Sequence, residues 1–289
     1  MFALALSGGG LLGAAHLGVV QALAEQGLSP AAYAGTSAGG LVAGVLAAGA
    51  PIGRLIGLGQ AVADDPRRYF AVNWRGLWDE VRPEDGPPPT GLIDPGHFVE
   101  SLAELCPTVA TTSGWKQPCA VISLDLVSEV AVAFVHPGTL RGPARGRWRI
   151  VADRPLGEAL QATMALPGLF AGIRTATSVL VDGGGADTVP ADWAAALRSG
   201  PVLAVDVAPP QRLAPARIGL WEALVRTENY GTNAESALRA EGLPVLTLTP
   251  DTADIPFFGF RDYARLVERG RQSVLANLSA IRRFLGEEG

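Results

Sequence analysis

The stretch A-Y-A-G-T-S-A-G-G, residues 32–40, decides the fold of this chain. Its first part, Ala32–Ala34, is a short apolar run and predicts a buried strand. The small apolar residues of Ala38–Ala48 follow almost at once and predict a helix. Ser37 therefore lies at a sharp turn from a strand into a helix, within the pattern G-x-S-x-G.

Ser37 is predicted to be a nucleophile, because such a turn presents its hydroxyl at the end of a sheet. Gly35 and Gly39 remove side chains that would collide across so tight a turn. The amide of Ala38, in the first turn of the helix, points at any oxyanion that forms there. The alternative is a serine that only caps the helix, which is common at glycine-rich turns.

The rest of the chain alternates between short apolar runs and helical periodicity. Predicted strands lie at residues 2–6, 119–126, 130–136, 148–151, 179–181, 202–207 and 245–249. Predicted helices lie at residues 12–26, 95–105, 156–164, 191–198, 218–239 and 263–285, and residues 52–78 begin as a helix and then lose the pattern. This alternation predicts a three-layer α/β/α sandwich around a mostly parallel central sheet. Because no repeat or linker interrupts it, we expect a single domain over residues 1–289.

Composition excludes several classes of protein. The 289 residues carry a net charge of −5 and no cluster of Lys or Arg, which argues against a nucleic-acid partner. Cys106 and Cys119 are expected to be buried thiols, and neither a metal nor an organic cofactor is expected. Residues 1–6 lack a basic start, and no stretch approaches the roughly 20 apolar residues of a membrane span. We therefore expect a cytoplasmic protein, with peripheral membrane contact left open.

A second glycine motif, Gly8-Gly9-Gly10-Leu11-Leu12-Gly13, also separates a predicted strand from a predicted helix. Its glycines allow the backbone to approach a ligand and to direct amides towards it, as a phosphate or an oxyanion requires. The spacing fits a dinucleotide fingerprint as well. That fingerprint needs an acid after the next strand, where this chain has Gly35-Thr36-Ser37, so the nucleotide interpretation is rejected.

A third motif, Asp182-Gly183-Gly184, follows the apolar strand predicted at residues 179–181. An acid at the carboxyl end of a buried strand lies where α/β sheets place their sites. In isolation, a turn-forming aspartate would be the better interpretation. All three motifs follow predicted strands, so we expect one sheet edge to bring Ser37, Asp182 and the first glycine loop together.

In this order and at these separations, the motifs G-G-G-x-x-G, G-T-S-A-G-G and D-G-G resemble those of the patatin-like phospholipase family. Residues 16–23 resemble the first helix of that family, and residues 160–170 resemble the segment before its catalytic aspartate. Pro190 matches a proline usually found after the D-G-G motif. The resemblance covers residues 2–50 and 155–207.

The resemblance implies a carboxylic ester hydrolase of the phospholipase A or lipid esterase type, with an acyl ester or phospholipid as substrate. It implies a dyad in which Ser37 forms an acyl-enzyme and Asp182 takes its proton and later activates water. The implied oxyanion hole consists of backbone amides of Gly8, Gly9, Gly10 and Ala38, and the motif glycines are Gly13, Gly35, Gly39, Gly183 and Gly184. Two alternatives remain: an acyltransferase or thioesterase on the same site, and a non-catalytic acyl-binding protein that keeps the fold.

Two positions depart from the family pattern. Leu12 stands where the family usually has Lys or Arg. The oxyanion hole then rests on amides alone, the substrate is less anionic, or the activity is low. Asp187 stands where the family commonly has Asn. We expect Asp187 to be a surface acid rather than a second carboxylate near the site.

The histidines offer no obvious base for Ser37. The chain contains only His16, His97 and His136, and none is followed by a pattern that identifies a general base. A Ser-His-Asp triad that uses His97 or His136 is the minor alternative, because lone histidines are more often structural. A dyad makes heavy demands on the oxyanion hole, since a carboxylate is a weak base with an ordinary pKa near 4.

Two aromatic stretches bear on the substrate. Residues Phe70–Trp78 interleave aromatic side chains with arginine, which suits either a lid that meets lipid or ordinary core packing. Residues Ile255–Phe260 suit either the wall of an acyl channel or a clamp on the last helix. Neither stretch distinguishes phospholipid from neutral lipid or a simple ester.

Overall fold

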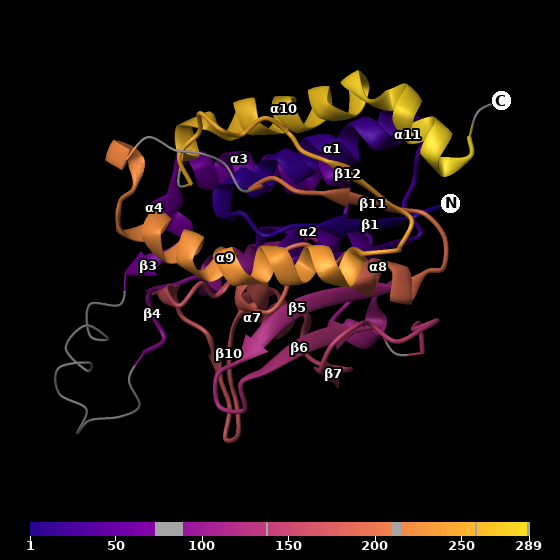
Figure 1. Cartoon of the computed structure of the whole chain (residues 1–289). Coiled ribbons are helices and arrows are strands. Elements are labelled where there is room, and N and C mark those ends of the chain that lie inside the picture. Colours follow the sequence, from indigo (N-terminus) through magenta and orange to yellow (C-terminus); the bar gives the residue numbers. More distant parts are fainter. Residues whose placement is uncertain (73–88, 137, 210–214, 258, 288–289) are drawn as a thin grey trace, which may run out of the picture.

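The computed structural model describes residues 1–72, 89–136, 138–209, 215–257 and 259–287 (Figure 1). In this part of the chain a nine-stranded sheet forms the middle layer. Its order is β12 (Val245–Leu248), β11 (Val202–Val205), β1 (Ala3–Leu6), β2 (Ala32–Thr36), β5 (Cys119–Asp125), β10 (Val179–Asp182) and β9 (Ile173–Arg174), with β6 (Val130–Val135) and β7 (Trp148–Val151) joined through β5. The strands from β12 to β5 are parallel, whereas β10 and β6 both run antiparallel to β5.

Helices cover both faces of this sheet. One face carries α1 (Ala14–Glu25), α2 (Ala38–Ala47) and α7 (Leu156–Met164), with α3 (Ile52–Asp64), α6 (Gly96–Glu104) and α10 (Tyr263–Ala276) packed against them. The other face carries α8 (Ala191–Leu197), and α9 (Leu220–Ala240) lies beside α8 (Figure 1). The predicted three-layer α/β/α fold with a mostly parallel sheet is confirmed.

The two faces of the sheet differ in the size of their side chains. Leu4 and Leu6 of β1 are fully buried among the helices of the α1 face. Alternate positions point to the other face, and there β1 has Ala3 and Ala5, which pack in the same cluster as Trp193 of α8. Small side chains on this face let α8 lie close to the strands, and Trp193 fills the space with 1% of its surface exposed.

Two predicted helices are different in the structure. The helix predicted over residues 263–285 is two helices, α10 and α11 (Leu278–Leu285), with a break at Asn277. The segment predicted to start as a helix at residue 52 contains α3 and then the single turn α4 (Pro66–Tyr69), which begins at a proline. Trp74 and Trp78, the tryptophans of the first aromatic stretch, lie outside the described residues.

A small second sheet is present that the sequence patterns did not predict. It consists of β3 (Ala71–Val72), β4 (Gly91–Asp94) and β8 (Gly168–Phe170). These strands are two to four residues long, too short to leave a period-two pattern. The single domain over residues 1–289 stays a prediction. None of the helices in the described ranges has both the length and the apolar composition needed to cross a membrane.

Candidate active site

Ser37 lies between the end of β2 and the start of α2, with a backbone that few residues adopt. Its φ is 53° and its ψ is −124°, and such a positive φ is strained for a residue with a side chain. The glycines around it are required by close packing. A Cβ on Gly35 would lie 2.2 Å from the carbonyl oxygen of Gly39, and one on Gly39 would lie 2.3 Å from the carbonyl oxygen of Leu6. The turn therefore holds the Ser37 hydroxyl in one position above the sheet.

Asp182 meets Ser37 because β2 and β10 share one edge of β5. On that edge the last residue of β2, Thr36, pairs with Ile122 of β5. The last residue of β10, Asp182, pairs with Ser123, the next residue of β5. The opposite edge of β5 is taken by β6. The two strands run towards each other and end at the same point. Ser37 Oγ donates a hydrogen bond of 2.6 Å to Asp182 Oδ2.

This arrangement corrects one part of the sequence argument. The motifs were expected to meet because parallel strands end at one sheet edge. That reason holds for β1 and β2, which carry the glycine loop and Ser37. It is wrong for β10, which is antiparallel to β5 and delivers Asp182 from the opposite direction.

The carboxylate of Asp182 is buried, with 4% of the residue exposed. Its second oxygen, Oδ1, accepts a 2.8 Å hydrogen bond from the amide of Gly184. Gly183 allows this tight turn, since a Cβ there would lie 2.4 Å from the carbonyl oxygen of Ile122. Burial, and then the negative charge of nearby Glu228, raise the pKa of Asp182 to about 8. A carboxylate held this way is a much stronger base than an exposed one.

Glu228 is a second carboxylate near Asp182 that the sequence patterns did not reveal. It lies on α9 and accepts a backbone hydrogen bond from Gly185, while Gly184 donates to Asp182. Burial raises the pKa of Glu228 as well. The helix pattern around residue 228 contains several polar positions, and nothing in the sequence indicates which of them faces β10.

Thr163 positions the backbone of Ser37, and the sequence patterns did not reveal it either. Its Oγ1 accepts a 2.9 Å hydrogen bond from the Ser37 amide and donates one of 2.5 Å to the carbonyl oxygen of Ile122. Thr163 is fully buried at the end of α7. One hydroxyl therefore ties the strained turn at Ser37 to β5, the strand that aligns Ser37 with Asp182.

Replacing Thr163 by Val is expected to lower the kcat of ester hydrolysis about 10- to 100-fold with KM nearly unchanged, because small displacements of a nucleophile are costly. Thr163→Ser keeps the hydroxyl and is the matched control, expected to restore most of the rate. Initial rates over a range of p-nitrophenyl ester concentrations give kcat and KM separately. Equal losses in both variants would contradict the positioning role and indicate a packing effect.

The first glycine loop lies beside Ser37. Gly9 and Gly10 have φ of 156° and 55°, which are the glycine-favouring values, and Gly10 begins the 3₁₀ turn η1 (Gly10–Gly13). Gly13 packs against α2, where a Cβ would lie 2.4 Å from that of Ala38. The Gly8 amide donates to the carbonyl oxygen of Thr188 at 3.1 Å. That amide is therefore engaged, and Gly9, Gly10 and Ala38, each at the start of a helical turn, are the better candidates for oxyanion donors.

None of the three histidines, all within the described residues, lines the pocket at Ser37. His16 is buried in α1 with Nε2 2.9 Å from the carbonyl oxygen of Ser7, and burial lowers its pKa to about 4. His97 is on the surface of α6 beside Glu100. His136 follows β6 and bonds through its amide to Cys119. Asp182 is therefore the proton acceptor that the geometry offers to Ser37.

Ser37 and Asp182 open into a pocket of about 60 Å³. Its described lining includes three acids, Asp182, Asp206 and Glu228, and no lysine or arginine. A larger groove of about 810 Å³ adjoins it, and the two share the walls Ala208, Val225, Asn229, Asn233 and Phe257. Leu12, at the position of the expected cation, is 4% exposed and lines the groove. In the described residues no group of three His, Cys, Asp or Glu side chains is placed to hold a metal ion.

The aromatic stretches have different positions. Phe70 packs against Phe98 and Phe170 with ring centroids 5.3 and 5.4 Å away, as ordinary packing requires. Phe257 faces Gly10, where a Cβ would lie 2.5 Å from its ring, and it lines both cavities. The second stretch therefore supplies a wall of the cavity at Ser37.

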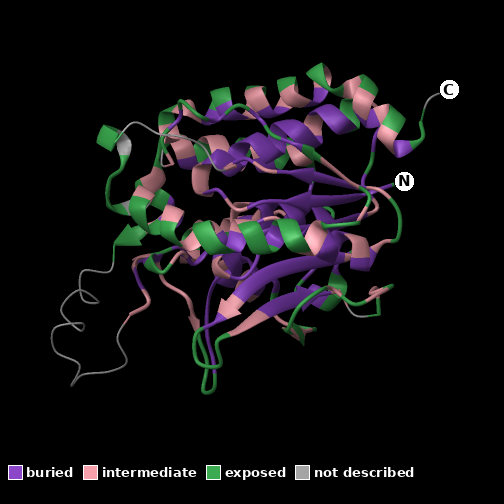
Figure 2. Cartoon of the chain, viewed as in Figure 1, coloured by how far each residue is buried: buried purple, intermediate pink, exposed green. Residues whose placement is uncertain are grey.

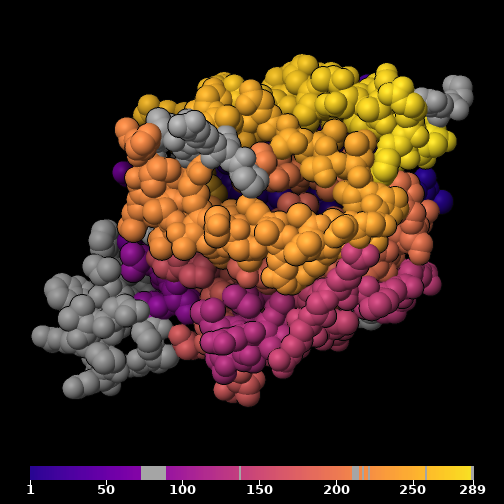
Figure 3. All heavy atoms as spheres, viewed as in Figure 1, coloured from indigo at the N-terminus to yellow at the C-terminus, as the bar shows by residue number. Residues whose placement is uncertain are grey.

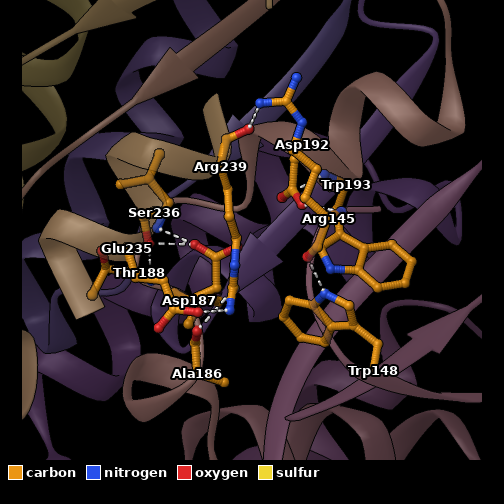
Figure 4. Close-up of polar contacts among 12 residues, drawn as sticks. Arg145, Trp148, Ala186, Asp187, Thr188, Asp192, Trp193, Glu235, Ser236 and Arg239 are labelled. Atoms are coloured by element: carbon orange, nitrogen blue, oxygen red, sulfur yellow. Dashed lines mark hydrogen bonds and ion pairs between the residues drawn. The ribbon is translucent and has the colours of Figure 1, made fainter. Parts of the chain in front are cut away.

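Asp187 is not the surface acid that the sequence predicts. It is fully buried and accepts a 2.5 Å hydrogen bond from Ser236 Oγ, and its other oxygen lies 3.4 Å from the Arg239 guanidinium (Figure 4). Arg239 also stacks 5.0 Å from the ring of Trp148. The prediction was wrong because the partners of Asp187 come from α9, about fifty residues later in the chain. Asp187 fastens α9 to the loop that follows β10.

The family model described as patatin-like phospholipase matches residues 4–195. An uncharacterized NTE family protein of Mycobacterium tuberculosis is 26% identical over 304 aligned positions, which cover 96% of this chain and 46% of that protein. Lysophospholipase nte1 of Neurospora crassa is 26% identical over 75% of this chain and 13% of its own length. VipD of Legionella pneumophila aligns with a TM-score of 0.48 and 14% identity over 96% of this chain and 67% of its own. The chain spans about half the length of its mycobacterial relatives.

Proposed function

Because the chain belongs to the patatin-like phospholipase family, a family of lipid hydrolases, we propose that it hydrolyses acyl esters through a Ser37–Asp182 dyad. The observation that carries this proposal is the 2.6 Å hydrogen bond from Ser37 Oγ to the buried carboxylate of Asp182. A serine hydroxyl is a weak nucleophile and needs an adjacent base. No histidine lies in the described pocket to serve as one.

The reaction proceeds through an acyl-enzyme. Ser37 Oγ attacks the ester carbonyl carbon as its proton passes to Asp182 Oδ2, and the tetrahedral intermediate places its oxyanion near the amides of Gly9, Gly10 and Ala38. Collapse breaks the ester bond, and Asp182 returns the proton to the leaving alkoxide. Water then enters, gives a proton to Asp182 and attacks the acyl-enzyme. As the second intermediate collapses, Asp182 passes this proton to Ser37 Oγ, which releases the carboxylic acid and regenerates the Ser37 hydroxyl and the ionised Asp182.

The lining of the pocket supports a substrate that is uncharged next to the ester bond. Asp182, Asp206 and Glu228 make the pocket acidic, and Leu12 supplies no cation. When Asp182 is ionised, as proton transfer from Ser37 requires, a phosphate close to the scissile bond would be repelled. The adjoining groove of about 810 Å³ lies within the range of small-molecule sites and has room for an acyl chain. We propose neutral acyl esters as the class to test first.

Two experiments test the proposal. A fluorophosphonate probe should label Ser37, and p-nitrophenyl esters of several chain lengths should be hydrolysed. A folded protein that the probe does not label would favour a non-catalytic acyl binder. Rapid labelling with transfer of the acyl group to alcohol or thiol acceptors in preference to water would favour an acyltransferase, which uses the same acyl-enzyme.

Glu228→Gln is expected to shift the acid limb of the kcat/KM profile to lower pH. Asp182 accepts the Ser37 proton only when ionised, and the charge of Glu228 raises its pKa. The kcat/KM of the wild type should therefore rise at pH values well above the ordinary pKa of a carboxylate. Removing the charge of Glu228 should move this rise to lower pH. Glu241→Gln, at the exposed end of α9, makes the same change in charge away from the pocket. An acid limb that is the same in all three proteins would contradict this assignment.

A further inference from the structure

The outer side of α9 is apolar and exposed. Leu220, Leu224 and Leu238 are 69%, 46% and 66% exposed, and Tyr230 is 87% exposed. Positions 220, 224 and 238 fall on one side of a helix, since each turn takes 3.6 residues, and Tyr230 lies about 80° around the helix from Leu220, towards the groove. Figure 2 shows exposed residues along the outer side of this helix. Soluble proteins rarely leave such a row of large apolar side chains uncovered.

This outer side carries almost no charge. Among the residues of α9 whose exposure is described, Glu235 is the one exposed charged residue, and Arg239 of the same helix pairs with it. The whole chain has a net charge of −5. A surface of this kind gains little from an anionic partner, whose charge it would not neutralise. It suits a partner surface that has an apolar interior and an outer layer without net charge.

The inner side of the same helix forms part of the proposed active site. Val225, Glu228, Asn229 and Asn233 line the pocket at Ser37. The larger groove continues along the helix and reaches Tyr230, one of its exposed residues. Figure 3 shows a hollow between α9 and the chain that follows β12, with N-terminal residues at its floor. Whatever covers the outer side of α9 therefore lies at the mouth of the groove.

The C-terminal half of α9 is fastened to the rest of the protein. Ser236 donates a hydrogen bond to Asp187 and Arg239 forms an ion pair with it, and Arg239 also donates a hydrogen bond to the carbonyl oxygen of Ala186 (Figure 4). The side chain of Thr232 is buried as well. The exposed leucines therefore belong to a fixed helix, and they cannot turn inward without breaking these contacts.

We propose that the outer side of α9 docks on a zwitterionic lipid surface, placing the groove opening against the acyl chains. This proposal rests on the proposed function, because the helix matters to lipid only if the pocket behind it hydrolyses acyl esters. A lipid surface fits the exposed leucines of α9 better than a protein partner does. The inner side of the same helix lines the groove, so a lipid surface bound to the outer side would bring substrate to the groove opening. Insertion of the three leucines to the level of the headgroups supplies the affinity.

The test measures how much of the full chain sediments with phosphatidylcholine vesicles. Leu220→Ser/Leu224→Ser should bind roughly tenfold or more weakly than wild type, because two leucines lose their apolar contact. Leu126→Ser/Val127→Ser removes two apolar residues with 46% and 62% exposure on the β5–β6 turn, and should bind as wild type does. Neither pair lines the pocket at Ser37 or the adjoining groove. Thermal melting of each variant checks that it is folded.

The outcomes separate the two proposals. If wild type binds vesicles but the probe does not label Ser37, the proposed function fails and the docking surface stands. If the probe labels wild type while both double variants bind vesicles equally, the docking proposal is overturned. It is also overturned if wild type is a dimer that Leu220→Ser/Leu224→Ser converts to a monomer without vesicle binding, since α9 would then be an interface between two copies. Wild-type binding should change little between low and high salt, and a steep loss would point to an electrostatic surface elsewhere.

Discussion

Ser37→Ala is expected to lower ester hydrolysis by at least about 10⁴-fold and to abolish labelling by a fluorophosphonate, while the protein stays folded. The substitution removes the Oγ that donates to Asp182 and leaves the backbone of the turn unchanged. The Ser37 amide can still donate to Thr163, so the strained conformation keeps its support. The loss should therefore be chemical, with little change in melting temperature.

The measurement is kcat/KM for a soluble p-nitrophenyl ester, with probe labelling followed by mass spectrometry of the modified peptide. Ser101→Ala is the matched control, because Ser101 lies on the surface and donates only to a backbone carbonyl of its own helix. It should keep wild-type activity. Persistent labelling in Ser37→Ala would place the nucleophile elsewhere and refute the dyad.

Asp182→Asn is expected to lower kcat about 10³- to 10⁴-fold and to make the protein more stable at pH 8 than wild type is. The amide is close in shape to the carboxylate but cannot accept the Ser37 proton, and it can present the wrong hydrogen-bonding group to Oγ. The loss should fall on kcat, because the substrate groove is not altered.

The stability change follows from the raised pKa of Asp182. The ordinary pKa of an aspartate is near 4, and that of Asp182 in the folded protein is about 8. At a pH between these two values, Asp182 holds a proton in the folded wild type that it has released in the unfolded chain. Wild-type stability therefore falls as pH rises through this range, and the neutral asparagine removes that part of the dependence. Urea melts at pH 5 and pH 8 measure it. A variant that is less stable than wild type at pH 8, by a wider margin than at pH 5, would contradict the raised pKa.

The sequence predicts local features of this protein well. The runs around Ala32–Ala34 and Ala38–Ala48 give the strand, the turn and the helix that hold Ser37, because glycine and small apolar residues leave few other options there. The alternation of such segments along the chain gives the three-layer fold. The motif order also indicates that Ser37 and Asp182 are near each other, and their side chains are 2.6 Å apart.

Features that depend on distant pairing could not be predicted. Thr163 contacts Ser37 across 126 positions of the chain, and its own segment is an ordinary amphipathic helix. Glu228 reaches Asp182 only because α9 lies beside η4 (Gly183–Gly185), and Asp187 is buried for the same reason. The antiparallel direction of β10 leaves no trace in its four residues, since strand direction is set by the partner.

The meeting of β2 and β10 along one edge of β5 also has a consequence for folding. The two side chains of the dyad are 145 positions apart, and their contact forms only when both strands have paired with β5 in register. A slip of β10 by two residues would carry the carboxylate about 7 Å away from the hydroxyl. Pairings over so long a loop form late, because the entropy of closing the chain must be overcome first. Recovery of activity during refolding should therefore lag behind recovery of helical circular dichroism, which makes turnover a reporter of correct strand register.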